Sequence, residues 1–277
     1  MTHPATRWGG LSRAERDAAY DNVAAVPGAR SYMAGLRAAS AAFRTAPRDA
    51  TLDVAYGPAP RQRWNLYPAE SAGAPCLVFL HGGYWQWNDP EHFACLAAGL
   101  RARGWSVAMA GYTLAPEASL TRIVGEIDAA LTWLAAHGRP HGIAGPILVS
   151  GWSAGGTLAA LALGHPAVAA GLAVSGIFEL GPLRDTGLNA ALNLADAEIK
   201  RFSPLRLPPV GKPLAIAYGS RELPALCHDS RALHGLRAAA HQPGLLLPVA
   251  GADHFSILET LRDPDGELTR IACLLLP

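Results

Sequence analysis

The sequence predicts an α/β protein built on a doubly wound, mostly parallel sheet of eight strands. Strand-like and helix-like segments alternate from residue 75 onward, which is the pattern of a parallel sheet wound through helices. The strand candidates there are continuous apolar runs, as expected where helices cover both faces of a sheet. Half of the 277 residues are hydrophobic and only 16% are charged, so the chain can bury a large core.

The first part of the chain, residues 1–50, is predicted to be a helical extension of the sheet domain. Its apolar positions fit short amphipathic helices better than strands; they include Val23, Val26, Met33, Leu36 and Phe43. Two short β-type runs follow, Thr51–Tyr56 and Gln62–Tyr67, separated by Gly57-Pro58-Ala59-Pro60. We expect these two runs to pair as antiparallel strands at the front of the sheet.

Six further strand candidates alternate with helical stretches. The strands are Cys76–Leu80, Trp105–Ala110, Ile147–Ser150, Leu172–Ser175, Leu214–Tyr218 and Leu245–Val249, and the helices cover 90–103, 119–137, 154–164 and 227–240. Glycines end three of these helices, at Gly104, Gly138 and Gly164, where a residue without a Cβ is favoured. Two strands at the front and six alternating ones make eight, and we expect residues 1–277 to form a single domain.

Residues 178–209 interrupt the alternation. They follow a strand candidate but contain four prolines and two short helix-like pieces, which does not fit a strand-to-helix crossover. We interpret the segment as an insertion over the edge of the sheet that caps a site there. A long surface excursion without function is the alternative.

Charge and composition exclude several classes of partner. The net charge is +1 and no run of Lys and Arg is present, so nucleic acid is not an expected partner. No apolar run approaches the ~20 residues that span a bilayer, and no apolar signal core opens the chain, so we expect a cytoplasmic protein. The four cysteines are scattered, which predicts reduced, buried thiols. No pair of histidines has metal-ligand spacing. Neither a metal nor another cofactor is expected, and the sequence leaves a homo-oligomer open.

The strongest chemical signal is Gly151-Trp152-Ser153-Ala154-Gly155, which lies between an apolar strand and a helical run. A serine on a sharp strand-to-helix turn has a strained backbone, so its neighbours must be small. The turn lifts Oγ clear of the sheet, and the helix N-terminus behind it favours developing negative charge. A glycine-rich turn packed into a helix would give the same letters, but the strand–motif–helix context favours Ser153 as a nucleophile.

A second motif, His81-Gly82-Gly83-Tyr84-Trp85, follows another apolar strand. Acyl transfer needs backbone N–H donors aimed at the tetrahedral oxyanion, and glycines let the main chain approach that oxygen. We assign the amides of Gly82 and Gly83 to this oxyanion hole, with the amide of Ala154 as their partner. His81 is expected to hold the loop by hydrogen bonds.

The general base and its orienting acid are predicted from position. His254 lies in Gly251-Ala252-Asp253-His254-Phe255, just after the last apolar strand, where an α/β site gathers its groups. The carboxylate that orients the imidazole should come between the serine and the histidine in the chain. Glu222, in the loop after the strand Leu214–Tyr218, is the choice. Asp229 lies further along a helix, Asp253 adjoins the histidine, and Asp196 falls in the 178–209 segment.

Together these motifs resemble the arylformamidase (kynurenine formamidase) group of α/β-hydrolases, over most of the chain. The HGGYW form of the glycine motif is more specific than the HGGG form of the related hormone-sensitive-lipase-like esterases. The resemblance implies the α/β-hydrolase fold, a triad of Ser153, Glu222 and His254, and cleavage of N-formyl aryl amides or small esters. Glu222 stands where the family usually has Asp, and Trp152 stands where it often has His, which leaves the substrate open.

The predicted chemistry is a two-step acyl transfer from a small-molecule aryl amide or ester substrate to Ser153 and then, from the acyl-serine intermediate, to water. Four aromatic side chains are candidates for a wall around the leaving group, with core packing as the alternative: Tyr84, Trp85, Trp87 and Trp152. A short-chain carboxylesterase would use the same machinery. A ligand-binding protein on this fold would typically lack a triad member, whereas all three candidates are present.

Overall fold

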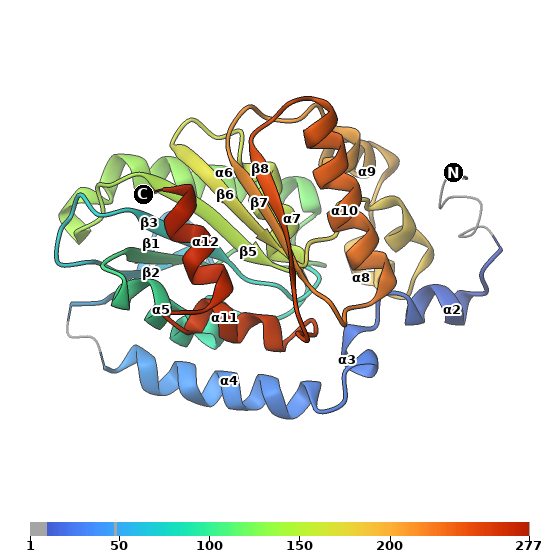
Figure 1. Cartoon of the computed structure of the whole chain (residues 1–277), viewed down its shortest axis with the longest axis horizontal. Coiled ribbons are helices and arrows are strands. Elements are labelled where there is room, and N and C mark those ends of the chain that lie inside the picture. Colours follow the sequence, from blue (N-terminus) through green and yellow to red (C-terminus); the bar gives the residue numbers. More distant parts are fainter. Residues whose placement is uncertain (1–9, 47–48, 277) are drawn as a thin grey trace.

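One mixed sheet organises the part of the chain that the computed structural model describes, residues 10–46 and 49–276 (Figure 1). Within these residues, eight strands form the sheet in the order β1-β2-β4-β3-β5-β6-β7-β8. Their bounds are β1 Thr51–Ala55, β2 Arg63–Tyr67, β3 Cys76–Leu80, β4 Ser106–Ala110, β5 Ile147–Trp152, β6 Val168–Val174, β7 Leu214–Gly219 and β8 Gly244–Val249. β2 pairs antiparallel with β1 and β4, and the other neighbours pair in parallel. The predicted eight-stranded, mostly parallel sheet is confirmed.

The central strands are buried along their whole length. Every residue of β3, β4, β5 and β7 is buried. Along β3 the side chains alternate between two cores, with Val78 and Leu80 in one and Leu77 and Phe79 in the other. Burial on both faces explains why these strands are continuous apolar runs in the sequence.

Helices cover the two faces of the sheet. Side chains of α6, α7 and α10 belong to one core, and those of α4, α5, α11 and α12 to the other. In Figure 1, α4 runs along the outside of this second layer, below α5 and α11. The bounds of the α-helices are α2 Arg13–Ala18, α3 Asn22–Ala25, α4 Ala29–Arg44, α5 Ala97–Ala102, α6 Leu120–His137, α7 Ala154–Ala162, α8 Asn189–Leu192, α9 Asp196–Phe202, α10 Pro224–Ala239, α11 Glu259–Arg262 and α12 Glu267–Leu275; short 3-10 helices cover Pro90–Leu96, Arg139–His141, Gly181–Asp185, Pro204–Arg206 and Ser256–Leu258.

Element boundaries differ from the sequence prediction in a few places. β6 begins at Val168 rather than Leu172. α10 begins at Pro224 rather than 227, because a proline suits the first turn of a helix, where its missing N–H has no partner to lose. The predicted helix 90–103 is divided into the 3-10 helix Pro90–Leu96 and α5.

The N-terminal helices pack against the sheet domain, and the buried hydroxyl of Ser40 hydrogen-bonds α4 to it. α2 begins with a capping box between Ser12 and Glu15. Further along, the Ser40 hydroxyl of α4 donates to the carbonyl of His92 and accepts from the amide of Cys95. Because Ser40 is fully buried, these bonds fix α4 against the helix Pro90–Leu96.

Residues 178–209 hold α8, α9 and two of the 3-10 helices. The start of the segment is anchored by the buried carboxylate of Asp229, which accepts from the amides of Phe178 and Glu179. Further along, Glu198 of α9 accepts from the amide and hydroxyl of Thr121 in α6. The segment is therefore tied to both α6 and α10.

Of the helices in the described part of the chain, none is long and apolar enough to cross a membrane. Cys76, Cys95 and Cys227 are buried free thiols, as the sequence predicted, whereas Cys273 is a free thiol that is only half-buried.

Candidate active site

Ser153 occupies the sharp turn between β5 and α7. Its backbone angles are φ 58° and ψ −122°, an unfavourable region for an L-residue that persists only when its surroundings enforce it. The neighbouring glycines are required by space: a Cβ on Gly151 would lie 2.1 Å from the carbonyl oxygen of Gly155, and one on Gly155 would lie 1.9 Å from that of Leu80. Close packing of this turn against β3 therefore holds Ser153 in its strained conformation.

His254 and Glu222 form a buried pair at the ends of the last two strands. His254 Nδ1 lies 3.0 Å from Glu222 Oε2, and the imidazole and carboxylate are nearly inaccessible to water. The other carboxylate oxygen, Oε1, accepts from the Ser175 hydroxyl and from the Gly219 amide. A carboxylate fixed in this way keeps the proton on Nδ1 of the neutral histidine, which leaves Nε2 as the proton acceptor.

The three other acids considered from the sequence have different partners. Asp229 binds the amides of Phe178 and Glu179, Asp253 accepts from the amides of the two residues after His254, and Asp196 pairs with Arg184. Glu222 is thus the carboxylate that the structure brings to the histidine.

Trp152 supports the histidine rather than only packing beneath the turn. Its ring lies 4.9 Å from the His254 ring, centre to centre, and its indole N–H donates to the His254 carbonyl over 2.7 Å. Trp152 also lines the cavity described below. The residue before Ser153 therefore links the serine turn to the histidine loop.

The glycine motif lies directly against the serine turn. A Cβ on Gly82 would lie 2.9 Å from Ser153 Cβ, and Gly83 has φ +117°, so neither position accepts a side chain without strain. Within residues 10–46 and 49–276, the amides of Gly82, Gly83 and Ala154 donate to no protein acceptor. Three unpaired N–H groups beside Ser153 are what an oxyanion hole requires.

A cavity of about 720 Å³ opens in front of these groups. Its sheet side is formed by Gly83, Tyr84, Trp87, Asn88, Trp152, Ser153, His254 and Phe255. Three of the four predicted aromatic wall residues are among them. Trp85 is not: it is fully buried in the core, because the loop turns its side chain inward while its carbonyl accepts from the Ala115 amide. Its assignment to the substrate wall was wrong.

The opposite wall comes from the N-terminal helices, which the sequence prediction did not place near the site. These residues are Asp17, Tyr20, Asp21, Asn22, Val23, Ala29, Arg30, Met33, Ala34 and Arg37. On α4 their spacing of three, four and seven residues marks a single helical face. The segment 178–209, predicted as the cap, contributes Gly187 and Leu188, so most of the covering comes from α2 to α4. The apolar periodicity of α4 indicates that one face of the helix packs against the protein. It does not indicate which surface that face covers.

Tyr84 connects the two walls. Its hydroxyl donates to the carbonyl of Tyr20 over 2.5 Å and accepts from the side-chain amide of Asn22 over 3.1 Å. Burial raises the pKa of the Tyr84 hydroxyl well above its usual value, so the group stays protonated and can donate. The loop next to the serine is thereby joined to the helices that cover the cavity.

The described residues contain no cluster of three or more His, Cys, Asp or Glu side chains suited to a metal ion. His81, the other histidine of the motifs, is fully buried, and burial lowers its pKa to about 3. It is therefore neutral, and its Nδ1 lies 3.0 Å from the Gly82 carbonyl. His81 holds the glycine loop, as predicted.

Comparison with known proteins agrees with this architecture. Residues 65–167 match the family model BD-FAE. The chain is similar to the kynurenine formamidase of Danio rerio, with 25% identity over 87% of each chain, and to that of Salmo salar, with 28% identity over 79% of this chain and 80% of the other. Among solved structures, a candidate thioesterase from Silicibacter sp. tm1040 superposes with a TM-score of 0.83 and 30% identity, covering 93% of this chain and 98% of that one.

The chain belongs to the α/β-hydrolases. Within them, its similarity to kynurenine formamidases extends over most of its length. The predicted α/β-hydrolase fold is confirmed, and so is the predicted resemblance to kynurenine formamidases over most of the chain.

Proposed function

We propose that the protein is a serine hydrolase that removes a small acyl group, with formyl favoured, from an aryl amide or ester. The observation that carries this proposal is that Ser153, His254 and Gly83 line one cavity. Glu222 holds His254 from behind, and the amides of Gly83 and of Ala154, the residue after the serine, have no protein acceptor in the described part of the chain. These groups come from four separate loops, and their assembly at one place is what nucleophilic acyl transfer requires.

The reaction proceeds in two steps. His254 Nε2 accepts the Ser153 proton as Oγ attacks the carbonyl carbon, and the amides of the oxyanion hole hold the negative charge that develops on oxygen. The tetrahedral intermediate expels the amine or alcohol, which receives the proton from His254, and acyl-Ser153 remains. Water, deprotonated by His254, then attacks the acyl carbon. The second tetrahedral intermediate expels Ser153 Oγ, which takes the proton back from His254, and the acid is released. Glu222 stabilises the imidazolium that forms in each step.

The charges opposite the serine support an aryl formamide that also carries ionised groups. Arg30 and Asp21 both line the cavity, and within the described residues no ion pair or hydrogen bond involves the Arg30 guanidinium. A cation without a protein partner and an anion in the same cavity suit a leaving group with a carboxylate and an ammonium. N-formylkynurenine has this chemistry, and the relatives named kynurenine formamidase point to the same class.

The test is kcat/KM on N-formylkynurenine and on 4-nitrophenyl acetate for the wild type and for Ser153→Ala. We expect both activities in the wild type, a clear preference for the formyl amide, and loss of both in the variant. Turnover that survives in Ser153→Ala would overturn the proposal. A wild type that barely cleaves the formyl amide but cleaves short esters rapidly would instead identify a carboxylesterase. A protein that binds the substrates but turns over neither of them and forms no acyl-enzyme with the activated ester would be a non-catalytic binder.

A further inference from the structure

The loop that carries the oxyanion-hole glycines is wound in an unfavourable conformation. Between residues 83 and 88, Gly83, Tyr84, Trp85 and Asn88 all have positive φ. For residues other than glycine this region costs roughly 1–2 kcal/mol each. A loop of this kind keeps one conformation only when surrounding groups hold it.

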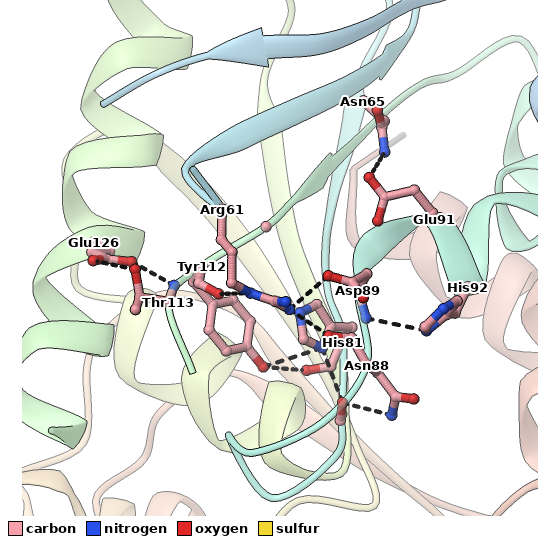
Figure 2. Close-up of polar contacts among 12 residues, drawn as sticks. Arg61, Asn65, His81, Asn88, Asp89, Glu91, His92, Tyr112, Thr113 and Glu126 are labelled. Atoms are coloured by element: carbon pink, nitrogen blue, oxygen red, sulfur yellow. Dashed lines mark hydrogen bonds and ion pairs between the residues drawn. The ribbon is translucent and has the colours of Figure 1, made fainter. Parts of the chain in front are cut away.

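Three contacts of Arg61 hold the far end of this loop (Figure 2). The Arg61 guanidinium donates to the carbonyls of Tyr112 and Asn88, and it pairs with Asp89 over 2.7 Å. Tyr112 in turn donates its hydroxyl to the His81 carbonyl and stacks on the His81 ring. The backbone at Asn88 is therefore fixed relative to the strand end from which the glycine motif leaves.

From that fixed position, the Asn88 side chain reaches back to the glycines. Its Nδ2 donates to the Gly82 carbonyl over 3.2 Å, and its Oδ1 accepts from Arg37 of α4 over 3.0 Å. The bond from Arg37 determines which end of the carboxamide faces Gly82, since an arginine can only donate. The same carbonyl also lies 3.0 Å from His81 Nδ1, which donates a second hydrogen bond to it in the tautomer that carries the proton on Nδ1.

The hydrogen bonds to the Gly82 carbonyl act on the catalytic donor through the peptide plane. The Gly82 carbonyl and the Gly83 N–H belong to one planar, trans peptide unit, in which the two bonds point in opposite directions. Glycine at both positions leaves this unit otherwise free to rotate. Fixing the carbonyl oxygen therefore fixes the direction of the Gly83 N–H, which donates to no protein acceptor in the described part of the chain.

We propose that Asn88 is a positioning residue, oriented by Arg37, that aims the Gly83 amide at the oxyanion. This inference rests on the proposed function, in which the Gly83 amide stabilises the transition state. It also gives α4 a role in the chemistry, because the helix that covers the cavity orients the side chain that holds the oxyanion hole.

The test compares Asn88→Ala, Asn88→Asp and Gln86→Ala. Asn88→Asp keeps the shape and the Arg37 contact but replaces the donor facing Gly82 with an oxygen. Gln86 is the matched control: it is a carboxamide in the same loop, but it donates to the Leu188 carbonyl. We expect both Asn88 variants to lose roughly 10- to 100-fold in kcat, less than the ~10²–10³-fold cost of removing an oxyanion donor. Gln86→Ala should stay within about twofold of the wild type.

Two further readouts separate positioning from structural damage or substrate contact. The kcat loss should be the same for the formyl amide and for 4-nitrophenyl acetate, with KM unchanged, because the oxyanion is common to both. A trifluoromethyl ketone, which forms an oxyanion on Ser153, should lose affinity by the same factor as kcat. If Asn88→Ala does not fold, Asn88→Asp carries the test.

Full kcat in a folded Asn88 variant, or a loss confined to KM, would overturn the inference. An equal loss in Gln86→Ala would do the same. Ser153→Ala distinguishes this from a failure of the proposed function: if that variant is inactive while the Asn88 variants retain full kcat, only the positioning role is wrong. If Ser153→Ala retains turnover, the proposed function itself is wrong.

Discussion

The two walls of the cavity differ in how their residues are held. On the sheet side, Ser153, His254 and Glu222 are buried, and each is fixed by backbone strain or by hydrogen bonds to neighbouring strand ends. On the helix side, Arg30 and Arg37 are exposed charges on one face of α4. The difference indicates a division of work. The reacting groups lie on the rigid sheet, whereas Arg30, which we propose selects the substrate, is an exposed charge on a helix.

The largest effect should come from removing the base. His254→Ala should lower kcat by about 10⁴- to 10⁶-fold on every substrate, because the loss concerns proton transfer rather than recognition. Initial rates on the formyl amide and on 4-nitrophenyl acetate measure it. His228→Ala, an exposed histidine on α10, is the control and should keep full activity. A decrease in kcat of less than tenfold in His254→Ala would show that this histidine is not the general base.

Glu222→Gln should cost about 10³- to 10⁴-fold in kcat with the fold intact, because the amide no longer enforces the reactive tautomer of His254. The kcat ratio of variant to wild type on the same two substrates provides the measurement, with circular dichroism to verify folding. If Glu222→Gln were nearly as active as the wild type, the orienting acid would have to be sought elsewhere.

Asp229 should make stability depend on pH. Burial raises the pKa of this carboxyl from 3.8 to about 7. The folded protein thus holds the proton more tightly than the unfolded chain, and the stabilisation is full below pH 3.8 and is lost as the pH rises to about 7. At roughly 1.4 kcal/mol per pKa unit the loss amounts to a few kcal/mol.

Asp229→Asn keeps an oxygen for the amides of Phe178 and Glu179 but cannot ionise. The free energy of unfolding of both proteins is measured in urea at pH 5 and at pH 8. Relative to the wild type, Asp229→Asn should be more stable at pH 8 than it is at pH 5. An identical difference at both pH values would contradict the raised pKa. Since Asp229 does not contact His254, kcat should change little.

The smallest effect should come from the helix side and should depend on the substrate. Arg30→Ala should raise KM for N-formylkynurenine by about tenfold and leave kcat and the neutral ester unaffected, which is the signature of lost uniform binding. Steady-state kinetics on both substrates checks this, with the exposed Arg270→Ala on α12 as the control. If the neutral ester suffered equally, α4 would serve the structure of the cavity rather than its selectivity.

The two walls also differed in how well the sequence predicted them. Local patterns locate Ser153 and the glycine motif, because a strand-to-helix turn requires specific small residues close together in the chain. His254 and Glu222 follow from their places after successive strands, since parallel strand ends meet at one edge of the sheet.

The helix wall depends on contacts across long separations in the chain, which no local pattern records. The amphipathic period of α4 predicts a helix but not the surface that it covers. Trp85 was assigned to the substrate wall for a different reason: its loop has positive φ values, which the residue types do not reveal, and its side chain is buried in the core. The prolines of residues 178–209 indicate an excursion from the strand–helix alternation, but they do not indicate where it lies. The segment was expected to cap the site, and it contributes only Gly187 and Leu188 to the cavity.

The central claim, that Ser153 is the nucleophile of a hydrolase, is tested most directly by mapping a covalent adduct. The protein is treated with a fluorophosphonate, digested and analysed by mass spectrometry. We expect a single modification, on Ser153, which is absent in Ser153→Ala and strongly slowed in His254→Ala. An unmodified Ser153 in folded wild-type protein, or an adduct on another residue that accompanies loss of activity, would contradict the account.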